Sequence, residues 1–245
     1  MTGPNVPPEL RRLWRMQPSS PLGRPAELDV ERVLGAALDL ADRHGLPGVT
    51  LPKVADALGV TKMALYRYVG SKDELFSLLA DMALTPPPTA EPGEDWRTAL
   101  RRWALANREV YRTHPWLAQL PVTGPPSGPN AIAWMDAMLH ILRETALTWP
   151  EKTGVLLLVG GWVRQTGLIS EEFGSGGRDQ REVERDYGRA LIELVEPERF
   201  PDAARLFQSQ MFEAPDPYDG DPDFDFGLET ILDGVSARIA AAAKR

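Results

Sequence analysis

The fold is decided by residues 50–72, which read TLPKVADALGVTKMALYRYVGSK. Apolar residues recur at helical spacing in two short runs of this stretch, and Gly59 separates the runs. A threonine stands directly before each run, where a helix N-cap is expected. The pattern predicts helices over 51–58 and 62–69 joined by a tight turn, which is the layout of a helix-turn-helix.

The chemistry of this stretch suits DNA. The second helix is short enough to lie in a major groove about 12 Å wide, while the first crosses the backbone. Residues 50–72 hold four basic side chains and one acidic one, Asp56, although the whole chain has a net charge of −8. Tyr66 and Tyr68 add hydroxyls that can donate to phosphate oxygens. On the pattern alone, the alternative is a solvated helix pair whose tyrosines belong to the core.

Helical periodicity continues on both sides. A first helix is expected from Val30 to His44, with Gly45 as its stop, and another over 72–84. Residues 86–93 read PPPTAEPG, which cannot continue a helix, so a domain boundary is predicted there. Beyond it, helices are expected over 96–113, 131–148, 151–169, 182–194, 201–211 and 226–243, with loops over 121–129, 174–177 and 214–222.

These elements predict an all-α chain in three parts. Residues 1–27 are expected to form a flexible N-terminal arm, residues 28–84 a helix-turn-helix DNA-binding domain, and residues 94–245 a second domain built as a helical bundle, to which the family resemblance described below assigns effector binding and dimerisation. The first 84 residues balance ten basic against ten acidic side chains, so the surplus negative charge belongs entirely to the rest of the chain.

Composition excludes several functions. With 245 residues, 43% of them hydrophobic and 25% charged, the chain is long enough for a proper core and is typical of a globular protein. It has no cysteine, which removes thiolate catalysis, disulfides and zinc–thiolate sites. The three histidines lack metal-ligand spacing, so no metal or cofactor is expected, and no catalytic constellation indicates an enzyme.

No membrane segment or export signal is expected either. The longest apolar run, Val155 to Val163, is about half the length that a membrane span needs. The N-terminus lacks an apolar segment followed by a small-residue cleavage site, so the cytoplasm is the expected location.

Three blocks of the sequence resemble the DNA-binding domain of the tetracycline-repressor (TetR) family. They are residues 48–51 (GVTL), 54–69 (VADALGVTKMALYRYV) and 71–75 (SKDEL), and the resemblance covers about residues 28–84. Pro52 departs from the polar residue common at its position, so a phosphate contact from there is lost. The resemblance implies a homodimer whose two recognition helices read a near-palindromic double-stranded operator.

The resemblance also implies two sets of DNA-contacting side chains. Thr50, Tyr66, Tyr68 and Lys72 would lie on phosphates. Lys62, Met63, Ala64 and Arg67 would face base edges. Lysine and arginine there can donate to guanine O6 and N7, and the two apolar side chains can meet a thymine methyl. Arg24 is a further candidate for the adjacent minor groove, with a disordered arm as the alternative.

The second domain is similar to the effector domain of the tetracycline repressors, more loosely, through residues 114–117, 128–130, 151–152 and 226–228. It holds six of the seven tryptophans, which suits a largely apolar cavity for a small apolar or aromatic effector. The candidate ligand-binding residues are His114, Trp116, Trp134, Met138, Trp162 and Gln165. For each tryptophan taken singly, ordinary core packing is the alternative.

Dimerisation is expected from the helices over 151–169 and 226–243, two from each subunit in an intermolecular four-helix bundle, as in the family. The last helix carries Leu228, Ile231, Leu232, Val235 and Ile239 on one face. An intrachain core is the alternative use of these apolar faces.

Together these observations predict a homodimeric transcriptional repressor that a small effector releases from its operator. One alternative is a ligand-independent DNA-binding or architectural protein whose second domain only dimerises or recruits a partner. An all-helical enzyme is the other.

Overall fold

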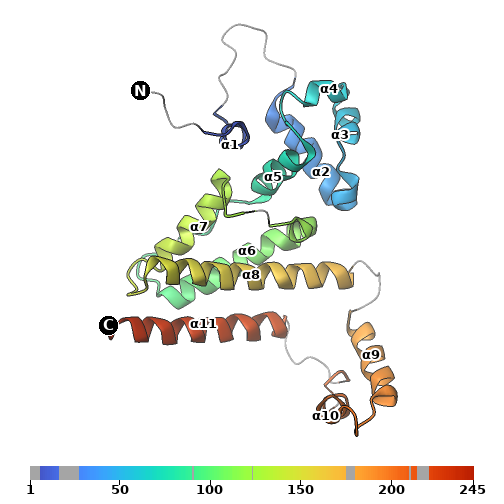
Figure 1. The fold of residues 1–245 in the computed structure, drawn as a ribbon, viewed down its shortest axis with the longest axis vertical. Coiled ribbons are helices and arrows are strands. Elements are labelled where there is room, and N and C mark those ends of the chain that lie inside the picture. Colours follow the sequence, from blue (N-terminus) through green and yellow to red (C-terminus); the bar gives the residue numbers. More distant parts are fainter. Residues whose placement is uncertain are drawn as a thin grey trace.

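The computed structural model describes residues 6–16, 28–89, 91–122, 124–174, 180–209, 211–213 and 221–245 (Figure 1). In chain order the elements are α1 (Pro8–Leu13), α2 (Val30–Gly48), α3 (Leu51–Leu58), α4 (Lys62–Leu65), α5 (Lys72–Ala83), α6 (Trp96–Thr113), the 3-10 helix η1 (Pro115–Gln119), α7 (Pro129–Ile141), α8 (Trp149–Gly174), α9 (Gln180–Leu194), α10 (Pro201–Gln208) and α11 (Pro222–Ala242). Within these ranges there is no strand, and the expected all-α fold is confirmed.

Helices α2 to α5 form the N-terminal domain, and each begins at a side-chain cap. The caps are Asp29, Thr50, Thr61 and Ser71, and each accepts a hydrogen bond from the backbone N–H three residues further on. Such a cap typically contributes about 1 kcal/mol, because it satisfies an amide that has no partner within the helix. Behind the caps, Leu34, Val54, Leu65, Val69 and Leu75 are buried in one core.

Two helices of this domain differ from their predicted lengths. Gly45 has a φ of +64°, so α2 breaks there as expected, but one more turn follows and carries the element to Gly48. The helix predicted over 62–69 is α-helical only to Leu65. Residues 66–68 continue as turns, and Val69 N–H donates to Leu65 O at 3.0 Å.

Part of the expected flexible arm is helical and anchored. Arg12 of α1 forms an ion pair with Glu74 of α5, and its Nη2 lies 2.8 Å from Glu74 Oε2. Leu13 is buried, and Trp14 Nε1 donates to Ser127 O at 2.8 Å. Helix α1 therefore contacts both domains. Arg24 lies outside the described residues.

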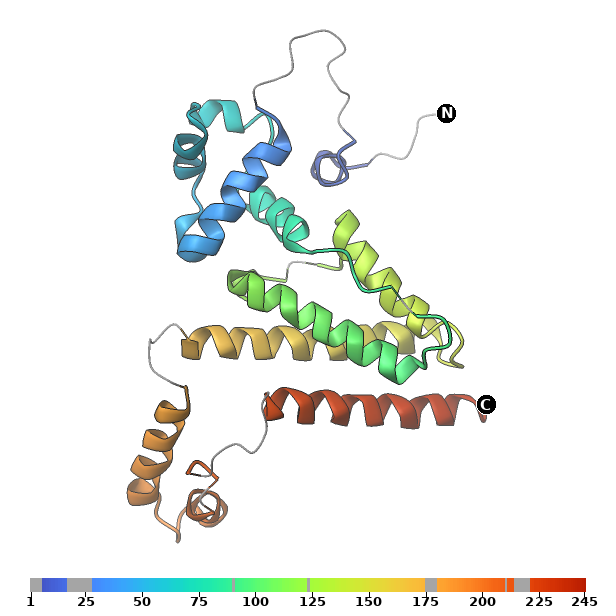
Figure 2. The ribbon, with the colours of Figure 1, turned by 180° about the vertical axis from the view of Figure 1, so that it is seen from behind.

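Helix α8 lies at the centre of the C-terminal domain and packs against α6, α7, η1 and α11. Figures 1 and 2 show α6 crossing α8, with α11 running alongside α8 in the opposite direction. Their buried apolar residues are Val155, Val159 and Val163 on α8 and Leu228, Leu232 and Val235 on α11. These residues are buried within a single chain, without a partner subunit.

One close approach fixes the spacing of α8 and α11. Trp162 of α8 lies against Gly227 of α11, and its Nε1 donates to Phe224 O at 3.1 Å. A Cβ atom at position 227 would overlap the indole, so only glycine fits there while the tryptophan keeps its place.

A row of arginines on α6 binds the carboxylates of α11. Arg97 lies 2.6 Å from Glu229 and Arg101 lies 3.0 Å from Asp225, and Arg97 also contacts Asp233 at 2.7 Å. These pairs are partly exposed, so each adds little stability alone, but together they set the register of α11 on α6.

Helix α7 ends at Ile141, earlier than the predicted end at Thr148. The chain turns after it, since Thr145 donates from both its N–H and its hydroxyl to Leu142 O. The predicted loops over 174–177 and 214–222 fall mostly outside the described residues.

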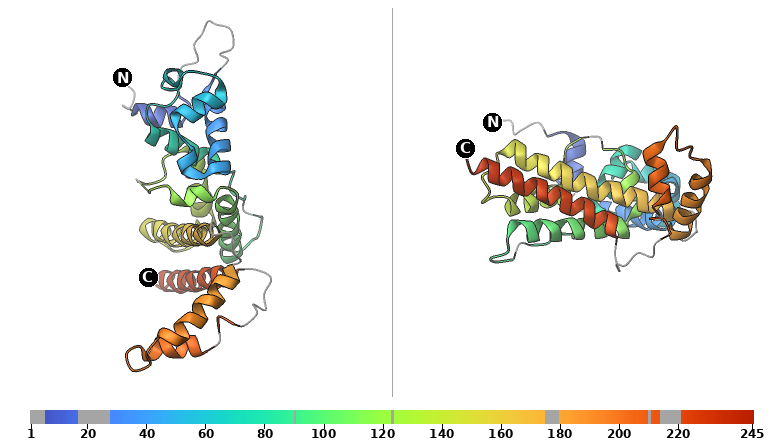
Figure 3. Two further views of the ribbon diagram at one scale, coloured as in Figure 1. Left: turned by 90° about the vertical axis from the view of Figure 1, so that its right-hand side faces the viewer. Right: turned by 90° about the horizontal axis from the view of Figure 1, so that it is seen from below.

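Helices α9 and α10 project away from the rest of the chain and pack on each other (Figure 3). Tyr187 of α9 makes edge contacts with Phe207 of α10 and with Phe212 in the turn beyond α10, and the centroids of the two phenylalanine rings lie 5.6 Å apart. No helix in the described ranges is long and apolar enough to cross a membrane.

The N-terminal domain is joined to the C-terminal domain through the end of α5. The buried carboxylate of Asp81 accepts a hydrogen bond from Ala131 N–H at 3.0 Å and so caps the first turn of α7. Burial raises the pKa of Asp81. Asn130 Nδ2 donates back to Asp81 O at 2.9 Å, and Trp134 Nε1 donates to Thr85 O at 2.6 Å.

Gly128 stands where this joint is tightest, because a Cβ atom there would overlap the Asp81 carboxylate. We expect Gly128→Ala to lower the free energy of unfolding by about 1–3 kcal/mol, the usual effect of overpacking. Urea denaturation at a fixed protein concentration measures it. Gly35→Ala is the control: nothing lies within 4 Å of that position, so alanine should stabilise α2 by about 0.5–1 kcal/mol. An equal change in the free energy of unfolding in the two variants would show that Gly128 is not tightly packed against Asp81.

Candidate nucleic-acid interface and effector site

The turn between α3 and α4 depends on Gly59. Its φ is +66°, and it ends α3 in the left-handed conformation. Val60 N–H then donates to Ala55 O at 3.0 Å, and Thr61 caps α4. The first residues of α4 are therefore presented by a rigid corner.

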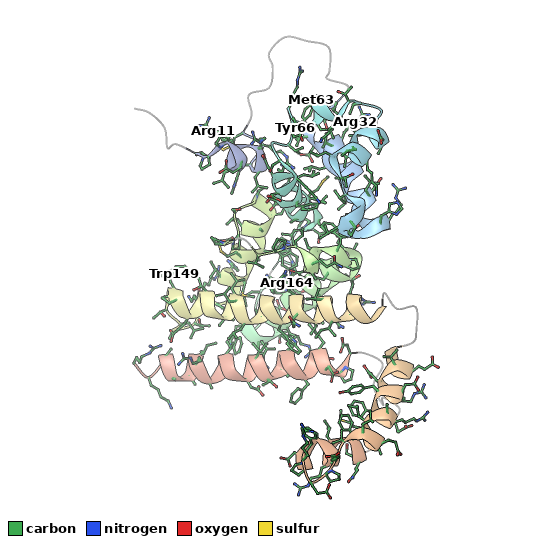
Figure 4. The ribbon with its side chains drawn as sticks, turned by 45° about the vertical axis from the view of Figure 1, so that its right-hand side comes forward. Arg11, Arg32, Met63, Tyr66, Trp149 and Arg164 are labelled. Carbon is green, nitrogen blue, oxygen red and sulfur yellow. The ribbon has the colours of Figure 1, made fainter. Side chains whose placement is uncertain are left out.

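Helix α4 and the turn after it expose the side chains that the sequence nominates for base contacts. Met63 is 72% exposed, and Lys62 and Arg67 are exposed as well. Tyr66 is 41% exposed, with the Lys62 ammonium 5.8 Å from its ring centroid. Met63 and Tyr66 lie at the end of the domain farthest from α8 and α11 (Figure 4).

Three other nominated residues also hold the fold. Thr50 caps α3, and Ala64 is half-buried. The Tyr68 hydroxyl donates to Leu28 O at 2.8 Å, which ties the turn after α4 to the residues just before α2. Lys72 is exposed on the first turn of α5, 5.1 Å from the Phe76 ring centroid.

The structure adds one basic residue to this surface. Arg32, on the first turn of α2, is exposed and lies at the same end of the domain as Met63 and Tyr66 (Figure 4). Its proximity follows from the Tyr68–Leu28 contact, which no local sequence pattern reveals.

The six nominated ligand residues fall in three separate places. His114 and Trp116 lie at the boundary between the domains. Trp134 and Met138 are buried in the core, where Trp134 packs edge-on against Trp103 with centroids 5.3 Å apart. The last two are on α8: Trp162 faces α11, and Gln165 is exposed. The structure therefore does not bring all six into one cavity.

One carboxylate oxygen contacts both His114 and Trp116 at the domain boundary. Asp42 Oδ1, on α2 of the DNA-binding domain, accepts a hydrogen bond from Trp116 Nε1 at 2.7 Å and lies 2.7 Å from His114 Nδ1. Trp116 is only 2% exposed, so its indole N–H depends on this acceptor. Arg164 of α8 holds the other end of η1 by donating Nη2 to Ala118 O at 2.8 Å (Figure 4).

A cavity of about 480 Å³ adjoins this contact, and we call it the junction cavity. It is lined by Ala41, Asp42 and Gly45 of α2, Arg108, Tyr111 and Arg112 of α6, Pro115 and Trp116 of η1, and Gly167 and Ser170 of α8. Both domains therefore contribute to its walls.

Helix α8 exposes two leucines, and α11 exposes one phenylalanine among polar side chains such as Asp233. Leu157 is 75% exposed and Leu158 is 59% exposed, and Phe226 of α11 is 76% exposed. Gly161 has nothing within 4 Å of where a Cβ would lie. The sequence predicted that the apolar stripe on α11 forms the dimer contact, and the structure corrects this. Leu228, Leu232 and Val235 of that stripe are buried inside the chain, so only the outer face of the helix is available to a partner.

Known proteins agree with this architecture. The sequence model of the bacterial regulatory proteins, tetR family, matches residues 33–79, and that of the tetracyclin repressor-like C-terminal domain matches residues 87–239. The HTH-type transcriptional repressor DrrR1 of Streptomyces coeruleorubidus is 32% identical over 242 residues, which cover 94% of this chain and 86% of that protein. The tetracycline repressor protein class E of Escherichia coli is 25% identical, over 87% of this chain and 93% of its own.

Solved structures give the same answer. ActR of Streptomyces coelicolor in complex with actinorhodin superposes with a TM-score of 0.74 at 26% identity, covering 86% of this chain and 97% of that one. The apo form of ActR gives a TM-score of 0.73 at 25% identity, covering 90% and 99%. The chain belongs to the TetR family of DNA-binding transcriptional regulators.

The Asp42 contact can be tested by removing its carboxylate. We expect Asp42→Ala to lower the free energy of unfolding by about 1–3 kcal/mol, because the buried Trp116 N–H loses its acceptor. Asp39→Ala, one turn earlier on the same helix, removes only an exposed pair with Arg43 at 3.6 Å and should change it by less than about 0.5 kcal/mol. Thermal or urea unfolding of both variants measures the difference, and equal effects would show that the contact carries no stability.

Proposed function

We propose that this regulator is a repressor that binds a near-palindromic operator as a homodimer and leaves it when a small aromatic effector binds. The observation that carries the proposal is the exposed surface of α4 and its following turn, where Lys62, Met63, Tyr66 and Arg67 stand on a corner fixed by Gly59. Because the rest of the chain holds the surplus negative charge, this end is the one that a DNA duplex can approach.

Within that surface we assign two kinds of contact. Lys62, Met63, Ala64 and Arg67 face base edges in the major groove. Thr50, Tyr66, Tyr68 and Lys72 bind phosphates and set the register of the helix. Arg32 joins the phosphate contacts because it lies at the same end of the domain. Phosphate contacts set affinity and its salt dependence, while base contacts set the sequence that is read.

The dimer is proposed to form through the outer faces of α8 and α11. Their exposed leucines and Phe226 would be buried against the same surface of a second copy, as a two-fold interface requires. Glycines at 160, 161 and 234 leave open space that lets the facing helices approach closely. The dimer places two recognition helices about 34–36 Å apart, one turn of DNA.

Ligand release is supported by the relatives. ActR has been crystallised with actinorhodin, and another similar protein is named a tetracycline repressor. An effector that prefers the conformation with mis-spaced recognition helices weakens operator binding by the coupling free energy, typically about 1–3 kcal/mol. We place this activity in the cytoplasm, where the DNA is, and assign the chain no catalytic role.

The competing function is DNA binding without a ligand. It predicts the same footprint on DNA in the presence and absence of any compound. Protection mapping of the DNA upstream of the protein's own gene, at stated salt, with and without aromatic compounds, distinguishes the two functions.

The recognition surface makes a direct prediction. We expect Lys62→Ala or Arg67→Ala to weaken operator binding by about 5- to 150-fold and to relax the preference at one base pair, because each removes donors to base edges. Lys72→Ala should weaken specific and random duplexes alike and reduce the salt slope by about 1. Gel-shift titrations at several salt concentrations measure both effects. Lys244→Ala, which removes an exposed lysine next to the C-terminal residue, is the control. An equal loss of affinity in this variant would show that α4 is not the DNA-binding surface.

The dimer surface makes another. We expect Leu157→Glu to shift the protein toward monomer and to weaken operator binding, because each copy would bury a carboxylate without a partner in the proposed interface. Sedimentation velocity measures the association. Val122→Glu is the control, since Val122 is equally exposed, at 73%, but lies in the loop after η1. A Leu157→Glu protein that remains dimeric would place the interface elsewhere.

A further inference from the structure

We propose that α1 is a second DNA-binding element of this regulator. Arg11 binds a backbone phosphate of the operator, while Arg12 and Arg15 neutralise two glutamates that would otherwise repel the duplex. The proposal rests on the DNA binding proposed above and adds a contact outside the helix-turn-helix. Helix α1 also lies outside both ranges that the family models match, residues 33–79 and 87–239.

The segment that contains α1 is basic although the protein is acidic. Residues 6–16 read VPPELRRLWRM, with three arginines and one glutamate. Their net charge is therefore +2, whereas that of the whole chain is −8. A local concentration of positive charge attracts the phosphates of DNA without reading their sequence.

Helix α1 is held in a fixed position by contacts with both domains. Leu13 is 6% exposed and belongs to the hydrophobic core. Trp14 Nε1 donates to Ser127 O at 2.8 Å, just before α7, and Arg12 binds Glu74 of α5. A helix of six residues is not stable alone, so these contacts determine where its arginines lie.

Arg12 neutralises a glutamate next to the proposed phosphate contact of Lys72. Glu74 lies on the first turn of α5, two residues after Lys72, and its side chain is 10% exposed. Its Oε2 accepts hydrogen bonds from Arg12 Nη2 at 2.8 Å and from Gly70 N–H at 3.0 Å. Without Arg12, this carboxylate would repel a phosphate that approaches Lys72.

Arg15 has the same effect at the start of α2. Its Nε lies 2.6 Å from Oε1 of Glu31, the residue before Arg32. Arg32 is one of the proposed phosphate contacts. Both glutamates that α1 pairs with are therefore neighbours in sequence of side chains assigned to the DNA backbone.

Arg11 is the arginine of α1 that is left for an external partner. Its side chain is exposed, and its Nε donates to Val6 O at 3.0 Å, so no carboxylate pairs with it among the described residues. Figure 4 shows Arg11 at the same end of the molecule as Arg32 and Tyr66. A guanidinium has five N–H donors and binds phosphate well, so Arg11 keeps donors for the DNA backbone.

The lack of cysteine in the chain allows a direct test of where Arg11 lies on DNA. In the full-length protein, Arg11→Cys provides one thiol for the attachment of iron–EDTA, whose hydroxyl radicals cut nearby DNA. The duplex is one that the unaltered protein selects from a random-sequence pool. Arg205→Cys is the matched control, because Arg205 is an exposed arginine of α10, which projects away from the rest of the chain (Figure 3).

We expect the labelled Arg11→Cys protein to cut the duplex once in each half-site and the labelled Arg205→Cys protein to leave it intact. Absence of cutting from position 11, at protein concentrations that saturate the duplex, overturns the proposal. Equal cutting from both positions overturns it as well.

Gel-shift titrations at several salt concentrations test the charge of Arg11. We expect Arg11→Ala to weaken binding to selected and random duplexes alike, by about 3- to 30-fold at low salt, because the dimer loses two exposed ion pairs. The salt slope should fall by about 1 for each subunit. Arg11→Lys keeps the charge and should retain most of the slope, and Arg205→Ala should change neither quantity. An unchanged slope in Arg11→Ala overturns the phosphate contact.

Two further variants test the neutralisation of Glu31. Arg15→Gln should weaken binding by about 2- to 5-fold, because the unpaired carboxylate repels phosphate. Adding Glu31→Gln to Arg15→Gln should restore the affinity. A double variant that binds as weakly as Arg15→Gln alone would show that Arg15 does not act through Glu31.

The same titrations separate this proposal from the proposed function. If Lys72→Ala lowers the salt slope and Arg11→Ala does not, the regulator binds DNA as proposed and only the role of α1 is wrong. If the unaltered protein selects no duplex, both proposals are wrong.

Discussion

Two carboxylates of the DNA-binding domain hold it on the domain behind it. Asp42 reaches from α2 to the indole of Trp116, and Asp81 reaches from α5 to the first turn of α7. Both are short polar contacts to groups that would otherwise lack a partner, so each joint has a defined geometry and can be broken by a competitor for the same atoms. Apolar residues of both domains also pack in one continuous core around these contacts.

The distribution of charge also differs between the two domains. The acidic surplus of the C-terminal domain is partly used by the arginines of α6, which bind the carboxylates of α11, and the remainder keeps that domain away from phosphates. The basic and tyrosine side chains gather at the opposite end, around α4. The electrostatic field of the protein therefore orients it with α4 toward the DNA before any base is contacted.

Local chemistry made the DNA-binding domain readable from sequence. Thr50, Thr61 and Gly59 act within a few residues of themselves, so the caps and the turn could be placed without knowing the fold. The faces of α8 could not be assigned in this way, because residues 155–159 are apolar all round and only packing decides which of them are buried. The Asp42–Trp116 contact spans 74 residues of chain and has no periodic signal. The same is true of α1, whose anchor on Glu74 depends on a pairing across 62 residues. For the tryptophans, composition predicted an aromatic domain correctly but could not distinguish core rings from cavity walls.

The close contact of Trp162 with Gly227 limits which substitutions the chain can accept at these two positions. Any side chain at 227 collides with the indole, and a smaller residue at 162 leaves a void between α8 and α11 that glycine cannot fill. The two positions can therefore drift only as a pair, through intermediates that pack badly. This point between α8 and α11 therefore tolerates a single substitution poorly.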